Sequence, residues 1–113
     1  MELSILEYAK GTEYDYLKEI FQNIESGYSV QFGTGCLKKG LKTPVQGDYT
    51  KHDKHKIVCI LEGKVILELE NDTTQKIILS SGDIFKIEKQ EGHAATILEN
   101  TKLIYVMFGE TTS

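Results

Sequence analysis

The stretch that decides the fold is IVCILEGKVILELE, residues 57–70. In its second half Val65, Leu67 and Leu69 would lie on one face of a strand, and Glu68 and Glu70 would lie on the other. This pattern is typical of an antiparallel sheet with one buried face and one solvated face. Glycine interrupts the run, and we interpret Glu62-Gly63 as a tight hairpin turn between two strands.

Short apolar runs of the same kind continue to the C-terminal end, separated by glycine and other turn residues. They predict strands at 28–32, 57–61, 65–70, 76–79, 84–88, 94–98 and 103–108, with further turns at 71–74 and 80–83. The lengths and spacing indicate an all-β fold, either a sandwich or a small barrel of antiparallel strands.

The N-terminal part has a different pattern. Leu17, Ile20, Phe21 and Ile24 follow a helical period, which predicts a short N-terminal helix that ends at Gly27. A short strand is expected before it, at 3–7. We therefore expect one domain over 1–113, in which 1–27 is a strand and helix segment and 28–113 is the barrel.

Composition narrows the function classes. The chain has 113 residues, 40% of them hydrophobic, and a formal charge of −4, which excludes a wholly disordered chain and disfavours a nucleic-acid partner. No apolar run is long enough for a membrane span, and no secretory signal is visible, so we expect a cytoplasmic protein in which Cys36 and Cys59 are free thiols. All 13 basic residues are lysine, which makes a phosphorylated ligand less expected, because arginine is the usual bidentate phosphate binder.

Three histidines stand next to predicted strands. His52 and His55 precede the strand at 57–61, and His93 precedes the strand at 94–98. Histidine is the commonest metal ligand and the usual proton carrier near neutral pH. These histidines are therefore the first candidates for a functional site.

The spacing of these histidines from two glycines resembles the cupin superfamily, whose motifs read roughly G-x5-HxH-x3/4-E-x6-G and G-x5-P-x-G-x2-H-x3-N. With Gly63 as the end of the first motif, its second histidine falls on His52, its first on Thr50 and its glutamate on Lys56. With Gly82 as the start of the second motif, its histidine falls on His93. The resemblance covers about 47–108 and implies a cupin-like antiparallel β-barrel of the jelly-roll type. The small single-domain cupins that it resembles are commonly proteins of unassigned chemistry.

The resemblance implies a site inside the barrel, and its contents stay open. Metal-binding cupins hold Mn, Fe, Ni, Cu or Zn through three histidines and a carboxylate, so His52, His55 and His93 are candidate ligands if His55 turns inward. Strict alternation would instead turn His55 outward, and an inward ammonium at Lys56 would repel a divalent cation. A metal-free pocket is the alternative, in which His52 and His93 move protons and Lys56 attracts an anion.

Both the metal-binding and the metal-free version of the site are compatible with two functional hypotheses. One hypothesis is an enzyme that acts on a sugar or a small keto or carboxylic acid, with His52 and His93 as catalytic residues and Lys56, Tyr49 and Tyr105 as binding residues. The other is a non-catalytic module that binds or senses a small ligand or a metal ion. The resemblance also implies a homodimer, in which Leu3, Ile5 and Leu6 would be buried; the same residues could instead cover the barrel's own edge.

Overall fold

The computed structural model describes residues 1–111, which form seven strands and no helix. Every strand pair is antiparallel, so the predicted all-β antiparallel architecture is confirmed. The strands are β1 (Leu17–Glu25), β2 (Tyr28–Leu37), β3 (Lys42–Thr43), β4 (His55–Leu69), β5 (Asp72–Ser80), β6 (Ile84–Ile87) and β7 (His93–Glu110). None of the described residues belongs to a helix that could cross a lipid bilayer.

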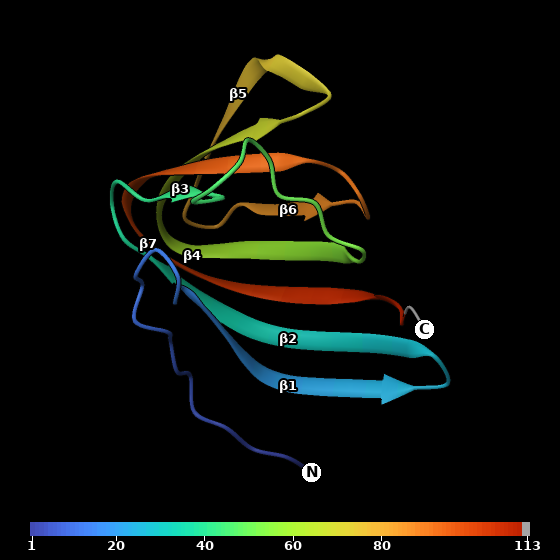
Figure 1. Cartoon of the computed structure of the whole chain (residues 1–113). Helices are drawn as coiled ribbons and strands as arrows, with labels where there is room; N and C mark the ends of the chain where they lie inside the picture. The colour runs from blue at the N-terminus through green and yellow to red at the C-terminus, as the bar shows by residue number, and fades with distance from the viewer. Residues whose placement is uncertain (112–113) are drawn as a thin grey trace.

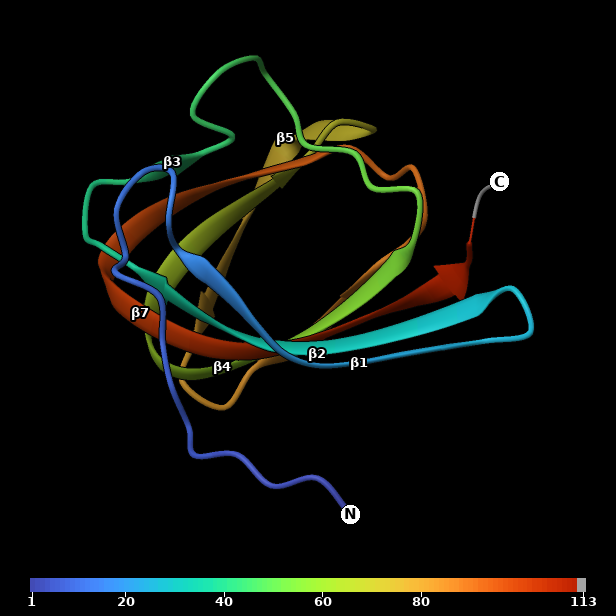
Figure 2. The ribbon, with the colours of Figure 1, turned by 60° about the horizontal axis from the view of Figure 1, so that its bottom comes forward.

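The strands form one sheet that rolls over on itself. Its order is β1-β2-β7-β4-β5, with β3 added beside β7 and β6 beside β4. The two long strands β4 and β7 curve through the molecule, so that one half of each lies with β1, β2 and β6 and the other half lies with β3 and β5 (Figures 1 and 2). The predicted barrel is therefore an open one, because the sheet path ends at β1 and β5 and these strands do not pair with each other.

The rolled sheet turns its corner at Gly63, where we predicted a hairpin. That prediction is wrong, because β4 runs on through Glu62 and Gly63 with a series of register shifts against β7. Gly63 has a φ of 107°, and a Cβ there would lie 2.3 Å from Thr101 Oγ1. Glycine is therefore needed for the close approach of two bent strands. The predicted strands at 94–98 and 103–108 are likewise the two halves of β7.

The predicted N-terminal helix is also wrong, because Leu17–Glu25 is strand β1. A β-bulge between Glu19 and Phe21 leaves Ile20 without a partner residue on β2. The extra residue breaks strict alternation and spaces the apolar side chains as a helix would. Gly27, expected to end the helix, has a φ of 76° in the turn that joins β1 to β2.

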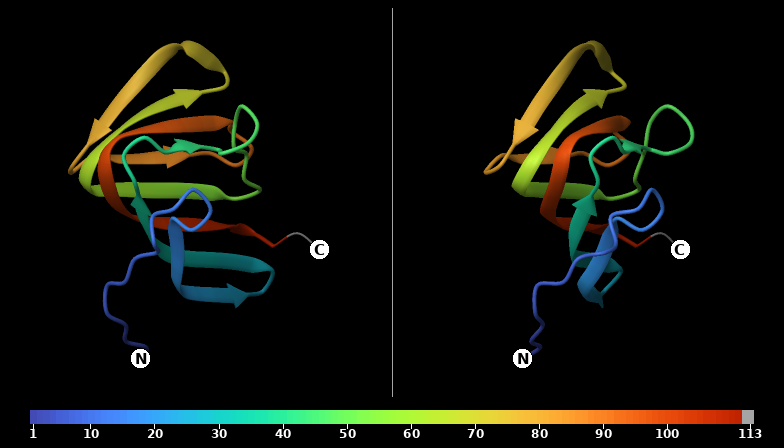
Figure 3. Two further views of the ribbon diagram at one scale, coloured as in Figure 1. Left: turned by 60° about the vertical axis from the view of Figure 1, so that its left-hand side comes forward. Right: turned by 90° about the vertical axis from the view of Figure 1, so that its left-hand side faces the viewer.

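Residues 1–16 have no regular structure, so the strand expected at 3–7 is absent; the first residues trail away from the sheet (Figure 3). The Thr34 hydroxyl donates a hydrogen bond to the Glu7 carbonyl oxygen and holds the segment to β2. Leu3, Ile5 and Leu6 are 80%, 73% and 61% exposed. Burial of these three residues between two copies of the chain stays a prediction.

The hydrophobic core lies inside the roll. Val65 and Leu67 face into it from β4, as the alternation predicted, and the predicted turn at 80–83 leads from β5 to β6. Cys36 and Cys59 are both free thiols. The buried core residues are Leu37, Ile60, Val65, Leu67, Leu79, Ile87 and Ile97. They come from both layers, which places any cavity between the layers inside an apolar wall.

Candidate functional site

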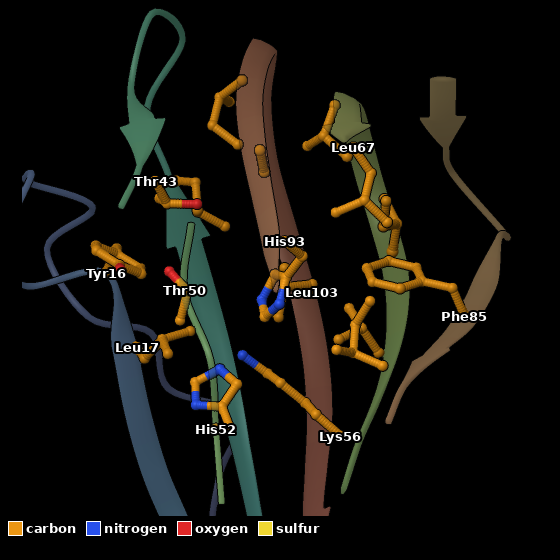
Figure 4. A pocket seen from close by; sticks show the side chains of 17 residues that line it. Tyr16, Leu17, Thr43, Thr50, His52, Lys56, Leu67, Phe85, His93 and Leu103 are labelled. Atoms are coloured by element: carbon orange, nitrogen blue, oxygen red, sulfur yellow. The ribbon is translucent and has the colours of Figure 1, made fainter. Parts of the chain in front are cut away.

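A cavity of about 110 Å³ opens beside the core, inside the roll. Its walls are mainly aliphatic and include Leu67 and Phe85 (Figure 4). The polar side chains that line it are those of Tyr16, Thr43, Thr50, His52, Lys56 and His93. The volume is below the roughly 150 Å³ of an engineered cavity that takes up benzene, so a ligand here has to be compact.

Strand alternation and one backbone bridge position the polar groups. Lys56 lies two residues before Val58 on β4, so both side chains face the cavity. Thr50 and His93 exchange backbone hydrogen bonds of 2.8 and 3.0 Å, and the Gln90 N–H donates to the His52 carbonyl oxygen at 2.8 Å. The segment that carries Thr50 and His52 is thereby fixed to the start of β7.

The two histidines form a pair. Their ring centroids are 5.4 Å apart with an interplanar angle of 39°. The Nδ1 atom of His93 lies 3.2 Å from the Glu91 carbonyl oxygen, a contact in which nitrogen donates. In that tautomer Nε2 keeps its lone pair, so His93 has an atom that can accept a proton.

The amine of Lys56 is directed between the two imidazole rings (Figure 4). Its Nζ atom lies 5.0 Å from the ring centroid of Tyr105, which is 7% exposed on β7. Among residues 1–111, the ion pairs within 4.0 Å do not include Lys56. Burial lowers the pKa of Lys56 from 10.5 to about 8, because no carboxylate compensates for the lost hydration of the ammonium.

Both histidines are held in the neutral form. Burial, followed by the charge of Lys56 and then by His93, lowers the pKa of His52 to about 4. Burial is also the main cause that lowers the pKa of His93, although its hydrogen bond to Glu91 acts in the opposite direction. At neutral pH the pocket thus combines one amine, largely protonated, with two uncharged imidazoles.

The other predicted site residues lie elsewhere. His55 is next to Lys56 in β4 and does not line the pocket; its Nδ1 lies 2.9 Å from Glu88 Oε2, and its ring is 5.4 Å from that of Phe108. Tyr49 does not line the pocket either, and Tyr105 reaches it only through its contact with Lys56. The structure therefore brings His52, Lys56 and His93 together and leaves His55 and Tyr49 apart.

The donor set does not fit the metal centre that the resemblance implies. Two imidazoles face the pocket, and the third place is taken by the ammonium of Lys56, which repels a divalent cation. No group of three or more histidine, cysteine, aspartate or glutamate side chains within residues 1–111 could hold a metal ion. The groups that the pocket offers for chemistry are the amine and the two imidazoles.

Tyr16, Leu17 and Thr43 are among the pocket residues that sequence reasoning missed. The first two belong to the segment interpreted as a helix, which we did not place against the barrel. Thr43 ends β3, a strand of two residues that is too short to give a periodic pattern. The only sequence signal at Tyr16 and Leu17 was the apolar content of the segment. Because of the bulge in β1, the apolar residues of that segment have a helical spacing, and we interpreted them as a helix.

Comparison with known proteins places this architecture. No protein-family model and no curated protein matches the sequence. A solved RmlC-like cupin from Desulfovibrio desulfuricans is similar in structure, with a TM-score of 0.66 and 14% identity over 95% of this chain and 94% of that one. A cupin superfamily protein from Desulfitobacterium hafniense has a TM-score of 0.58 and 14% identity over 85% and 78% of the two chains.

A third similar structure carries the name of an enzyme. A protein from Ralstonia eutropha, provisionally named a mannose-6-phosphate isomerase, has a TM-score of 0.58 and 19% identity over 84% of this chain and 86% of that one. At these identities the similarity concerns the fold. The chain has the cupin fold, as the two glycine-framed motifs predicted.

The depressed pKa of His52 predicts an acid-sensitive fold. Between about pH 6.5 and pH 4, His52 is protonated in the unfolded chain and neutral in the folded protein. The free energy of unfolding therefore falls as the pH falls. Because His52 is only partly buried, we expect a loss of about 2 kcal/mol from this group. Urea unfolding from pH 4.5 to 7.5 should show a smaller loss in His52→Gln than in the wild type. Equal slopes for both proteins would contradict the prediction.

Proposed function

We propose that the chain binds a compact keto acid in this pocket and moves the proton on the carbon next to its carbonyl group. One observation carries the proposal: an amine and two neutral imidazoles converge at a mainly apolar cavity. A base beside a positive charge is what removal of such a proton requires, because the electrons left behind collect on the carbonyl oxygen as an enolate.

The walls favour a keto or carboxylic acid over a sugar. The hydroxyl groups that line the cavity are those of Tyr16, Thr43 and Thr50. Leu67, Phe85 and their aliphatic neighbours add no further partners for the several hydroxyls of a sugar, and each hydroxyl buried without a partner costs about 1–3 kcal/mol. A short carbon chain suits these walls. The Lys56 ammonium can then pair with a carboxylate or with the developing enolate oxygen, and no carboxylate of the pocket competes for it.

The residues divide the chemistry between them. Nε2 of His93 is the base, because Nδ1 is engaged by the Glu91 carbonyl oxygen. Lys56 supplies the positive charge that stabilises the enolate. The imidazolium of His93 then carries the abstracted proton, and His52, 5.4 Å away between ring centroids, is placed to relay that proton back to the intermediate. Return to the other face or to a neighbouring carbon would make the reaction an epimerisation or an isomerisation.

Exchange of the α-proton tests this function without knowledge of the natural substrate. In D₂O, the wild-type protein should exchange the C3 protons of 2-oxobutanoate for deuterium, as followed by the loss of their ¹H NMR signal. His93→Gln should slow the exchange by about 100-fold or more, the usual range for removal of a general base. Lys86→Met, which removes an exposed lysine from β6, is the matched control and should leave the rate unchanged.

Binding measured in the same samples separates the two functional hypotheses. Shifts of the amide signals of Thr43 and Ala95 on addition of 2-oxobutanoate would report occupation of the pocket, since both residues line it. Binding without exchange would leave the chain as a non-catalytic module for small acids. If 2-oxobutanoate neither binds nor undergoes exchange, the proposed ligand class is wrong.

A further inference from the structure

We propose that Lys56 is a nucleophile, and that its amine forms an imine with the carbonyl group of an aldehyde or ketone bound in the pocket. This inference rests on the proposed function, because it uses the same pocket and the same carbonyl class of ligand. It goes further in assigning a covalent step and a reacting atom, Nζ of Lys56.

The position of the amine favours attack on a bound molecule. Lys56 projects from β4 into the aliphatic cavity and ends between the rings of His52 and His93 (Figure 4). A ligand that fills about 110 Å³ beside this atom is held against it. Placing two reactants side by side in this way removes much of the entropic cost of an addition reaction.

The surroundings raise the unprotonated share of the amine above that of an exposed lysine, while the protonated form still predominates at neutral pH. Among residues 1–111 no carboxylate forms an ion pair with Lys56, and the ring of Tyr105 covers one side of its Nζ at 5.0 Å. The same burial that lowers the pKa of Lys56 leaves more of the nucleophilic form at neutral pH than an exposed lysine has. All 13 basic residues of the chain are lysines, so the twelve lysines other than Lys56 serve as internal controls for its reactivity.

The reaction balances without an added oxidant or reductant. The lone pair of Nζ forms a bond to the carbonyl carbon, and the π electrons move to oxygen, which takes a proton. Nitrogen loses a proton to give a neutral carbinolamine. The hydroxyl group then leaves as water after a second protonation, the C=N bond forms, and release of the remaining proton gives the imine. The sum is an amine and a carbonyl compound going to an imine and water.

The imidazoles supply the proton transfers that these steps need. His93 can accept a proton at Nε2, and the ring of His52 lies on the opposite side of the Lys56 amine from His93. A protonated imine also withdraws electrons from the neighbouring carbon more strongly than the free carbonyl does. The imine would therefore make the proposed proton abstraction at that carbon easier.

Reductive trapping tests the proposal with butanal as the first probe. The folded protein is incubated with a low concentration of butanal and then treated briefly with sodium borohydride. Hydride adds to the imine carbon and leaves a stable secondary amine, which intact mass and peptide mapping can locate. We expect Lys56 to be modified at least tenfold faster than the average of the other twelve lysines. Equal modification of Lys56 and the exposed lysines would overturn the proposal.

A second probe and one variant sharpen the result. 2-Oxobutanoate should trap at Lys56, whereas 2-hydroxybutanoate, which has no carbonyl group, should not. Lys56→Met should lose this trapped adduct, and Lys86→Met should keep it. Exchange of the 2-oxobutanoate protons without any trapping at Lys56 would overturn the imine and leave the proposed function standing. Absence of exchange, binding and trapping together would overturn both.

Discussion

Replacing Gly63 by alanine is expected to lower the free energy of unfolding by about 3 kcal/mol or more, the largest loss that we expect from a single substitution here. Two costs add at this corner. The φ of 107° is unfavourable for any residue with a Cβ, and that Cβ would lie 2.3 Å from Thr101 Oγ1 and 2.6 Å from the Asn100 carbonyl oxygen. Relief of the clash requires β4 and β7 to separate where both strands bend.

Gly82→Ala is the matched control. Gly82 also has a positive φ, 92°, but a Cβ there would meet nothing within 4 Å. It should therefore cost only the backbone strain, about 1 kcal/mol. Urea unfolding of both variants measures the difference, which isolates the packing of the corner. Equal losses in Gly63→Ala and Gly82→Ala would show that the corner yields to the added methyl group.

Because Lys56 and the pocket share β4 with this corner, binding of 2-oxobutanoate to Gly63→Ala should weaken as well.

Replacing Lys56 by methionine is expected to stabilise the fold, by about 1–3 kcal/mol at pH 7. Burial lowers the pKa of Lys56 from 10.5 to about 8, so the folded protein bears the cost of a poorly hydrated ammonium. We place the gain below the full value of that pKa change, because the amine faces an open pocket and its contact with Tyr105 is lost. Methionine keeps the length and flexibility of the lysine stem without the charge.

The pH dependence of this gain identifies its cause. Above pH 10.5 the lysine is neutral in both states and bears no cost, and below about pH 8 the cost is complete. The advantage of Lys56→Met should therefore shrink as the pH rises from 8 to 10.5. Lys76→Met, at an exposed position on β5, should be nearly neutral at every pH. A Lys56→Met protein less stable than the wild type at pH 7 would contradict the prediction.

These two expected results concern opposite kinds of residue. Gly63 is required by the shape of the fold, whereas Lys56 lowers its stability. A charged group that weakens the fold and occupies a cavity is the pattern expected of a functional residue, because active sites commonly hold groups at a cost in stability. A measured stabilisation by Lys56→Met would therefore support the proposed role of the pocket.

The part of the candidate site that the sequence indicated came from the resemblance to the cupin motifs, together with the alternation of side chains along a strand. The spacing of His52 and Lys56 from Gly63 placed both in the first motif, and alternation along a strand turns Lys56 and Val58 to one side. His55 was ambiguous for the same reason. The gap before the glutamate position varies in length among the proteins that the motif resembles, so its parity was open until the strand was seen.

The sequence by itself determined the all-β class, the inward face of Val65 and Leu67, and the glycine-framed motifs of the cupin fold, because alternation and turn chemistry are local properties of the chain. Only the tertiary structure decided that Gly63 is a corner within β4, and that Leu17–Glu25 pairs with β2 as a bulged strand. It also decided that His52, Lys56 and His93 meet around one cavity. These features depend on contacts between segments far apart in the chain, and on the burial that such contacts create, which no local pattern encodes.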